Sequence, residues 1–324
     1  MVSFLCGSTG DVEQAQQTRG HRMDEETITA CAARITEAYS RGTSIAPLTD
    51  EFPDLTEAQA YDIAEAVRHE RERAGDRVIG WKIGFTNRTI WDQYGVHAPI
   101  WGPMYASTTR AFEQPGREGA EREPAGSANA PGARAAGERA AGERAAGEWP
   151  VAGLTEPQVE AEIAFRFSSA PRAGADEREL LESIDGVSHT LEVVRCPYPD
   201  WVFRPADTMA AAGLHGGLAV GPWHSIEPQD RDDWARALTT FGLTIRGDDG
   251  VEGTGQAQNV LGGPLSALKH FIDESARLRG GVLIRPGDIV TTGTVPPAYP
   301  LRAGQHWTTE VDGLPLPGLS LTAV

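Results

Sequence analysis

The feature that most constrains this chain is a short apolar segment with two glutamates, VEAEIAF over residues 159–165. Side chains alternate between the faces of a β-strand, so Glu160 and Glu162 point to one side, and the apolar residues between them point to the core. A third glutamate, Glu192, lies in a similar apolar segment, LEVV over residues 191–194. Carboxylates held this close repel each other, and a shared divalent cation would relieve the repulsion. The alternative is an amphipathic strand whose acidic face is solvated.

Composition narrows the class of protein. The net charge of −17 disfavours nucleic acids and anionic membranes as partners. Cys6, Cys31 and Cys196 include no CxxC pair, which argues for a reducing compartment and against a zinc site. No apolar run approaches the ~20 residues of a membrane helix, and the first residues lack the basic region of a signal peptide. We therefore expect a cytoplasmic enzyme or binding protein.

Residue periodicity divides the chain into regions. Residues 1–22 are polar and predicted to form a disordered tail. Apolar residues at helical spacing predict an N-terminal helical region over residues 23–77, in which Thr56 and Gln59 form the capping box of a second helix. After this region short strands and Gly or Pro turns predominate, broken by one helix over residues 265–278.

The second region predicts a large sheet. Residues 243–246, 282–284 and 288–292 have the composition of strands. Strands do not alternate regularly with helices, so we predict an α+β fold with a small helical region followed by a large curled mixed β-sheet over residues 78–324. Residues 113–148 are almost entirely Gly, Ala, Pro, Glu and Arg and end in three copies of RAAGE, which predicts a disordered insert within this domain.

Lys82 is the next candidate for chemistry, in the segment GWKIGF over residues 80–85. The flanking Gly80 and Gly84 would let backbone or a ligand approach closely. A lysine in a strand can simply extend its ammonium group into water. A partly desolvated lysine would instead bind a substrate carboxylate or move protons, because burial lowers its pKa. The residues themselves leave both interpretations open.

Four motifs, in the same order along the chain, resemble those of one known family. They are GWKIGFT with GVHAP (residues 80–86 and 95–99), PQVEAEIAF (157–165), LEVV with Asp200-Trp201 (191–194 and 200–201), and residues 255–268 followed by PGDIVTTGT (286–294). This set resembles the 2-hydroxypentadienoate hydratase and 4-oxalocrotonate decarboxylase family, a branch of the fumarylacetoacetate hydrolase superfamily. The resemblance extends from about Met23 to Leu321.

The resemblance implies a fumarylacetoacetate hydrolase-like fold and roles for matching residues. Glu160, Glu162 and Glu192 match ligands of Mg²⁺ or Mn²⁺, and Lys82 matches an active-site lysine. Family substrates are 2-oxo acids or their 2-hydroxydienoate enols, which chelate the metal and react through a metal-stabilised enolate. The resemblance also implies a homo-oligomer, associated in some cases with a related enzyme of aromatic catabolism.

The chain departs from this family around the implied pocket. Ile100 replaces an Asp, and Ala211, Ala212 and Leu214 replace an Asp, an Asn and a Ser. We infer a working metal site with a drier, reshaped pocket, in which His215 could supply a replacement acid or base; the alternative is a histidine without chemistry. We therefore expect Lys82 and His215 to be catalytic, and the residues expected to contact substrate are Gly84, Trp101, Leu214 and Thr294.

Three functions remain open. The first is a divalent-metal-dependent lyase, a hydratase or decarboxylase, acting on a 2-oxo acid or 2-hydroxydienoate. The second uses the same site for isomerisation or C–C bond hydrolysis of a larger apolar substrate. The third is a non-catalytic partner subunit. The retained glutamates and Lys82 weigh against the third, while the replaced polar residues weigh against a standard form of the first. We expect the first.

Overall fold

The computed structural model describes residues 23–112 and 145–324 of the 324-residue chain. The predicted tail over residues 1–22 and most of the predicted insert therefore lie outside the described residues. Residues 145–148, which the sequence assigned to the insert, belong instead to strand β4 (Ala145–Trp149), which pairs in parallel with β14 (Leu319–Ala323). The RAAGE composition concealed this strand because ladder hydrogen bonds are made by the backbone, whatever the side chains.

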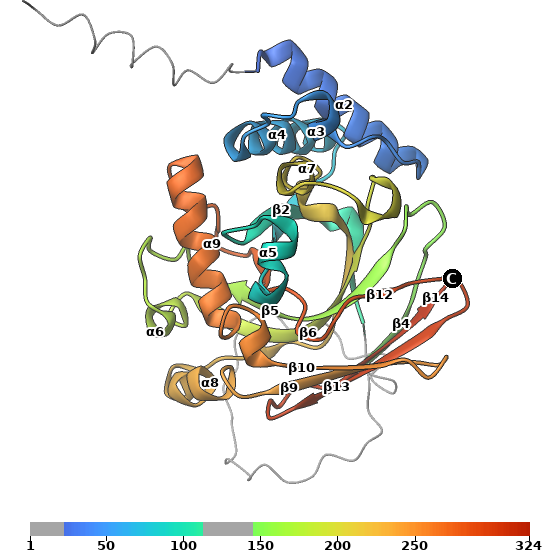
Figure 1. Cartoon of the computed structure of the whole chain (residues 1–324). Coiled ribbons are helices and arrows are strands. Elements are labelled where there is room, and N and C mark those ends of the chain that lie inside the picture. Colours follow the sequence, from blue (N-terminus) through green and yellow to red (C-terminus); the bar gives the residue numbers. More distant parts are fainter. Residues whose placement is uncertain (1–22, 113–144) are drawn as a thin grey trace, which may run out of the picture.

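The helices form one layer above the sheets and a second group at one side (Figure 1). As predicted, Thr56 and Gln59 form the capping box of the second long helix. Helix α4 packs against α2 and α7, and α9 packs against β1 and α6. The helices are α2 (Glu25–Arg41), α3 (Leu48–Glu51), α4 (Glu57–Arg73), α5 (Trp91–Tyr94), α6 (Glu177–Leu180), α7 (Pro205–Ala210), α8 (Arg231–Ala237) and α9 (Pro264–Arg279).

The strands form two sheets. The larger is mixed, with the order β2-β1-β11-β5-β6-β7-β3, and β12 and β8 pair with β5 and β6 at its side. The smaller has the order β10-β9-β13-β14-β4 and crosses the lower part of the view in Figure 1. The remaining strands are β1 (Val78–Gly84), β2 (Ile100–Tyr105), β3 (Thr109–Ala111), β5 (Gln158–Phe167), β6 (Ile184–Val194), β7 (His215–Val220), β8 (His224–Ser225), β9 (Gly242–Gly247), β10 (Glu252–Gln256), β11 (Ile289–Thr291), β12 (Tyr299–Pro300) and β13 (His306–Asp312).

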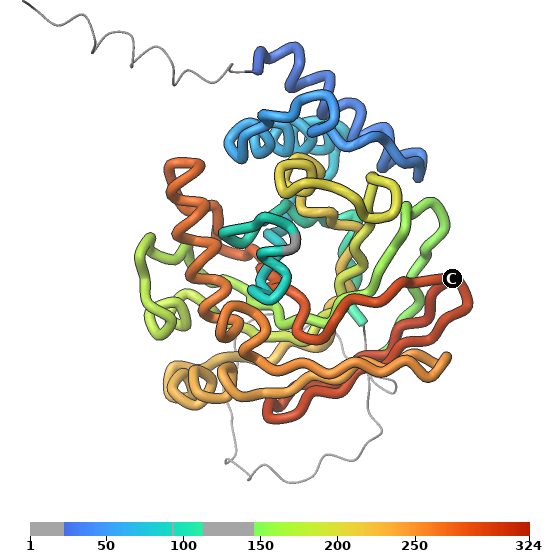
Figure 2. The backbone as a smooth tube through the Cα atoms, viewed as in Figure 1, coloured from blue at the N-terminus to red at the C-terminus, as the bar shows by residue number. Residues whose placement is uncertain are grey.

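The predicted α+β fold with a helical N-terminal region and a curled mixed sheet is confirmed. One predicted strand, over residues 282–284, is wrong: these residues run without ladder partners into the turn at Pro286, which has no N–H to donate. The chain ends beside β4, where the Val324 N–H donates to the Trp149 carbonyl at 2.8 Å (Figure 2).

Strand β5 lies in the interior of the larger sheet and is covered on both faces. Val159, Ala161, Ile163 and Phe165 are fully buried on one face, as the alternation predicted. Glu162 on the other face is also fully buried. Glu192 on β6 is fully buried too, and Glu160 is half-buried, which excludes the solvated-strand interpretation.

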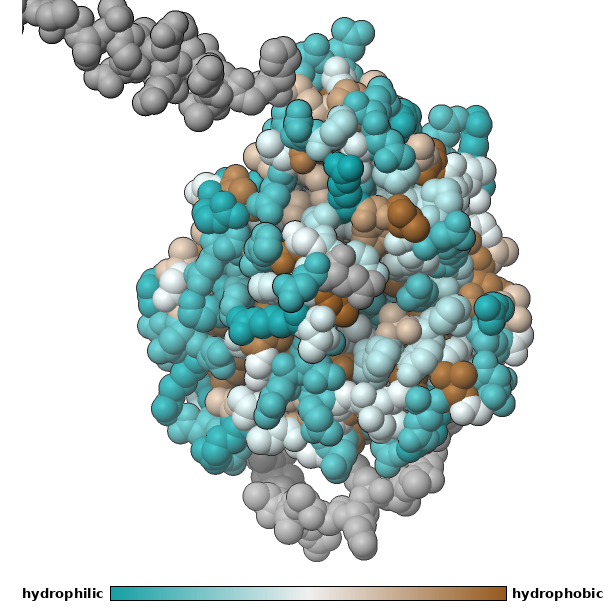
Figure 3. Space-filling model, viewed as in Figure 1, coloured by the Kyte–Doolittle hydropathy of each residue, from teal (hydrophilic) through white to brown (hydrophobic). Residues whose placement is uncertain are grey.

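The surface is mostly polar. On the face shown in Figure 3, hydrophobic residues occur in small separate patches, several of them near the middle of the view, where α5 lies in Figure 1. Among the described residues, no helix has the length and apolar character needed to cross a membrane.

Candidate metal centre and active site

Two paired strands bring the three predicted glutamates together. In the antiparallel ladder of β5 and β6, Glu160 lies directly opposite Glu192. Glu162 lies two residues along β5 and therefore on the same face as Glu160. One carboxylate oxygen from each residue lies within 4.8 Å of the others. Strand register thus places the acidic groups predicted from separate segments at one point.

The individual oxygens have unequal partners. Glu162 Oε2 accepts a hydrogen bond from the Gly293 N–H at 2.8 Å, while its buried Oε1 has no hydrogen-bond partner among the described residues. Glu192 Oε1 is 2.9 Å from His215 Nδ1, and its Oε2 is 3.3 Å from Lys82 Nζ. A buried carboxylate oxygen without a donor is costly, and cation coordination would satisfy it.

The charges of this cluster do not balance within the protein. Burial, and then the neighbouring Glu192 and Glu160, raise the pKa of Glu162 well above its ordinary value. Burial likewise raises the pKa of Glu160 to about 7, against the opposing effect of Lys82. Three carboxylates against one ammonium group leave two excess negative charges, the charge that a divalent cation neutralises. The all-oxygen donor set suits a hard cation such as Mg²⁺ or Mn²⁺.

Lys82 on β1 extends into this acidic cluster. Its side chain is 5% exposed, and its Nζ donates to the Gly213 carbonyl at 3.1 Å. Burial lowers the pKa of Lys82, but the three glutamates raise it by more, so the group is held charged. Gly213 has a φ of 68°, and a Cβ there would lie 2.9 Å from Lys82 Cδ, so glycine lets the backbone fold over the lysine stem.

The structure places His215 behind Glu192, outside the residues that line the cavity described below. Its ring is 3% exposed, and Nε2 lies 3.0 Å from the Thr108 hydroxyl. Burial lowers the pKa of His215, so we assign the neutral ring, with Nδ1–H donating to the Glu192 carboxylate. The Thr108 hydroxyl beside Nε2 also lies 3.1 Å from the Tyr105 carbonyl, to which it donates. This geometry favours a positioning role over the predicted acid–base role.

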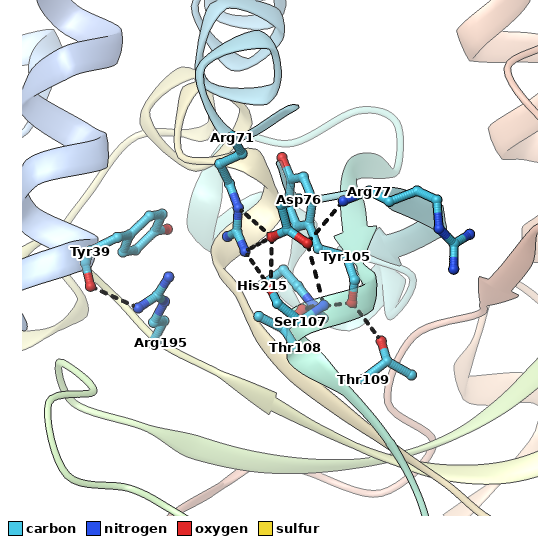
Figure 4. A network of polar contacts seen from close by, with 10 residues as sticks. All are labelled: Tyr39, Arg71, Asp76, Arg77, Tyr105, Ser107, Thr108, Thr109, Arg195 and His215. Carbon is cyan, nitrogen blue, oxygen red and sulfur yellow. Dashed lines mark hydrogen bonds and ion pairs between the residues drawn. The ribbon is translucent and has the colours of Figure 1, made fainter. Parts of the chain in front are cut away.

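Further polar contacts fix the segment that holds His215 (Figure 4). The neighbouring Ser107 hydroxyl donates to Asp76 at 2.6 Å, and Asp76 also accepts from Arg71 of helix α4 at 2.6 Å. The helical layer is thereby connected through Thr108 and His215 to Glu192. These contacts restrict the orientation of the Glu192 carboxylate.

A cavity of about 510 Å³ opens beside the cluster and is lined by Lys82 and Glu160. Gly84, Leu214 and Thr294, predicted to contact substrate, also line it. Trp101 does not: it pairs with Ile83 across the ladder, on the opposite face from Lys82, and stacks on Tyr61 with ring centroids 4.0 Å apart. Trp101 was expected to contact substrate but does not line the cavity, whereas its neighbour Ile100 does.

The family-divergent positions separate into two groups. Ile100 and Leu214 line the cavity, whereas Ala211 and Ala212 are buried outside its lining. Sequence reasoning also missed polar and aromatic lining residues. Four of them lie within the family-like motifs, although no role was expected of them: Phe85, Thr86, Gln158 and Trp201. Neither periodicity nor composition indicated the others, which are Asn87, Tyr94, Thr208 and Phe203.

Comparison with known proteins gives a family match and several named relatives. Residues 110–316 match the family described as fumarylacetoacetate (FAA) hydrolase C-terminal. The chain is 29% identical over 294 residues to a 2-keto-4-pentenoate hydratase of Burkholderia vietnamiensis, covering 90% of this chain and 96% of that protein. It is 26% identical over 292 residues to a 2-hydroxyhexa-2,4-dienoate hydratase of Comamonas testosteroni, with the same coverage.

A solved structure gives the same fold. The 4-oxalocrotonate decarboxylase from Pseudomonas putida G7, complexed with magnesium and adipate, superposes with a TM-score of 0.76 at 24% identity, covering 94% of this chain and all of that chain. The family match covers more than half of the chain and includes β5, β6 and their three glutamates. The chain belongs to the fumarylacetoacetate hydrolase family.

Proposed function

We propose that this protein is a divalent-metal-dependent lyase, a hydratase or decarboxylase, that acts on a 2-oxo acid or its 2-hydroxydienoate enol. The observation that carries the proposal is the buried cluster of Glu160, Glu162 and Glu192, with charged Lys82 beside it in the wall of a cavity. The hydratases to which the chain is similar over 90% of its length support the same reaction class.

The three glutamates would hold Mg²⁺ or Mn²⁺, which when bound supplies Lewis-acid polarisation of the 2-oxygen of the substrate. Lys82 binds the substrate carboxylate through its charged Nζ and holds the proton at that atom close to the reacting carbons. His215 and Thr108 orient the Glu192 carboxylate. The apolar walls at Ile100 and Leu214 exclude bulk water from the bound substrate.

A second outcome at the same site is isomerisation or C–C bond hydrolysis of a larger apolar substrate. The observation that favours it is the apolar character of Ile100 and Leu214 in the cavity wall, since fewer polar groups remain there to orient a water molecule. We further propose that the protein forms a homo-oligomer and associates with a related pathway enzyme.

Turnover tests the proposal directly. Purified protein with Mg²⁺ is mixed with a small panel of 2-hydroxydienoates, and the loss of the dienol ultraviolet absorbance is followed while products are identified by mass spectrometry. We expect metal-dependent conversion of at least one dienoate, abolished by chelation and restored by Mg²⁺. Absence of conversion across the panel, with the protein folded and metal-bound, would refute the lyase assignment.

A further inference from the structure

The wall of the cavity is mostly apolar beyond the acidic cluster. Among the described residues that line it, Lys82 is the only cationic side chain. Its Nζ is already engaged by Glu192 and by the Gly213 carbonyl. A substrate with one carboxylate can therefore use Lys82 at its 2-oxo acid end, but a second carboxylate at its far end would have no cationic partner in this wall.

Four aromatic side chains, Phe85, Tyr94, Trp201 and Phe203, form a continuous group in the same wall, which we call the aromatic cluster. Ring centroids are 5.4 Å apart between Phe85 and Tyr94, 5.7 Å between Tyr94 and Phe203, and 6.3 Å between Phe203 and Trp201. The residues come from three separate segments of the chain and are all half-buried. Such a surface can bury a flat or apolar group of a ligand.

Backbone strain is concentrated at this wall. Phe85, Trp201 and Leu214 have φ values of 53°, 56° and 63°, in the left-handed region that bulky residues rarely adopt. Hydrogen bonds hold the first two: the Trp91 ring N–H donates to the Phe85 carbonyl at 2.7 Å, and the Trp201 ring N–H donates to the Glu156 carbonyl at 3.2 Å. Strained backbone that presents bulky side chains to a cavity indicates a ligand-binding role.

Three arginines adjacent in sequence to lining residues are directed elsewhere. Arg195 donates to the Tyr39 carbonyl at 3.0 Å, and Arg204 donates to the Pro53 carbonyl at 3.4 Å. Arg88 lies between Asn87 and Thr89, which line the cavity, but its own side chain lines a neighbouring polar groove. Its guanidinium lies 5.6 Å from the centroid of the Trp91 ring and 3.4 Å from His270 Nε2. None of these arginines lines the cavity, so none is positioned as a partner for a distal carboxylate.

We propose that the cavity selects monocarboxylic 2-oxo acids or 2-hydroxydienoates whose far end is an alkyl or aryl group, and that the aromatic cluster binds this group. The proposal rests on the function proposed above and specifies its substrate class. The cavity volume of about 510 Å³ lies within the range of about 300–1,000 Å³ found for drug-sized ligands, which leaves room beyond a five-carbon dienoate. A dicarboxylic substrate is disfavoured because its second charge would be desolvated without a partner.

Binding of unreactive analogues tests this preference separately from catalysis. Calorimetry with the Mg²⁺-loaded protein compares 2-oxopentanoate, 2-oxo-5-phenylpentanoate and 2-oxohexanedioate. We expect 2-oxo-5-phenylpentanoate to bind about tenfold more tightly than 2-oxopentanoate, because its phenyl group buries additional apolar area. We expect 2-oxohexanedioate to bind more weakly than 2-oxopentanoate. A diacid that binds as tightly as the phenyl compound, or a phenyl group without effect, would overturn the proposal.

Substitutions in the aromatic cluster test its contribution to binding of the phenyl group. Phe203→Ala should abolish most of the phenyl preference, and Phe203→Arg should strengthen binding of the diacid relative to the phenyl compound. Val202→Ala is the matched control, because Val202 is adjacent, 67% exposed and outside the cavity lining, and should leave the preference intact. Tyr94→Ala, on another segment, repeats the test should Phe203→Ala lower Tm. An unchanged preference in both alanine variants would refute a role for the cluster.

The two proposals fail in different ways. A phenyl preference in binding without turnover of any dienoate would remove the lyase assignment and leave the selectivity standing. Turnover of dienoates together with a preference for the diacid would retain the lyase assignment and refute the selectivity.

Discussion

Replacing Glu162 by Gln should stabilise the metal-free protein while weakening metal binding. The substitution preserves shape and leaves the side-chain oxygen available to the Gly293 N–H, but it removes one negative charge from the buried cluster. At 4.8 Å and an effective dielectric constant of about 20, two like charges repel by about 3 kcal/mol. Loss of Glu162 removes two such repulsions and one attraction to Lys82, which leaves a gain equal to about one repulsion.

The measured gain should be smaller than this value. The raised pKa of Glu162 lets the metal-free protein relieve part of the repulsion by binding a proton, so we expect the free energy of unfolding to rise by about 1–3 kcal/mol. Each kcal/mol corresponds to roughly 2–4 °C in Tm for proteins of about 150–250 residues. Mg²⁺ should raise the Tm of the Glu162→Gln variant by less than it raises the Tm of the unsubstituted protein, because stabilisation by a ligand falls as its affinity falls.

Thermal unfolding with chelator and with Mg²⁺, together with calorimetric titration of the metal, measures both effects. Glu182→Gln, a change of the same chemistry at an exposed position, is the control and should alter neither value. The reasoning is refuted if Glu162→Gln lowers the Tm of the metal-free protein, or if metal affinity is unaffected.

Two other substitutions test the site, and a third tests the packing of helix α7, on which the buried Asp207 lies. Lys82→Met should reduce kcat by about 10²-fold or more while calorimetry still detects metal binding; retained turnover would remove Lys82 from the chemistry. His215→Leu should weaken metal affinity by about 10–100-fold, because His215 orients the carboxylate of the metal ligand Glu192. An unaltered calorimetric Kd for the metal would contradict this positioning role. Asp207→Ala should lower the free energy of unfolding by about 2–4 kcal/mol in denaturant titration, because it removes acceptors for Thr49 and Arg204; an unchanged midpoint would contradict this.

The acidic site could be predicted from the sequence because strand alternation is a local property. The spacing of Glu160 and Glu162 fixed their common face, and family-like motifs identified Glu192 and Lys82. Their convergence depends on strand register, which pairs Glu160 with Glu192 and which the sequence does not specify by itself. Ile100 and Trp101 are neighbours on β2 and point to opposite faces, so only one of them can line the cavity. The pairing of β2 with β1 decides which one does.

The remaining features depend on contacts between distant segments. His215 faces Glu192 and not the cavity because of the pairing of β7 with β6 and the position of Thr108 on another segment. The aromatic cluster gave no periodic pattern because its members lie on three loops or short helices. Strand β4 was concealed because its residues, which resemble a low-complexity insert, are ordered by backbone pairing to β14.

Diffraction at the Mn²⁺ absorption edge tests the central claim most directly. Crystals of the protein grown with Mn²⁺ and 2-oxopentanoate should give an anomalous peak within coordinating distance of Glu160, Glu162 and Glu192, with the ligand carboxylate beside Lys82 Nζ. A peak at another place on the chain, or a ligand bound away from Lys82, would contradict the proposed active site.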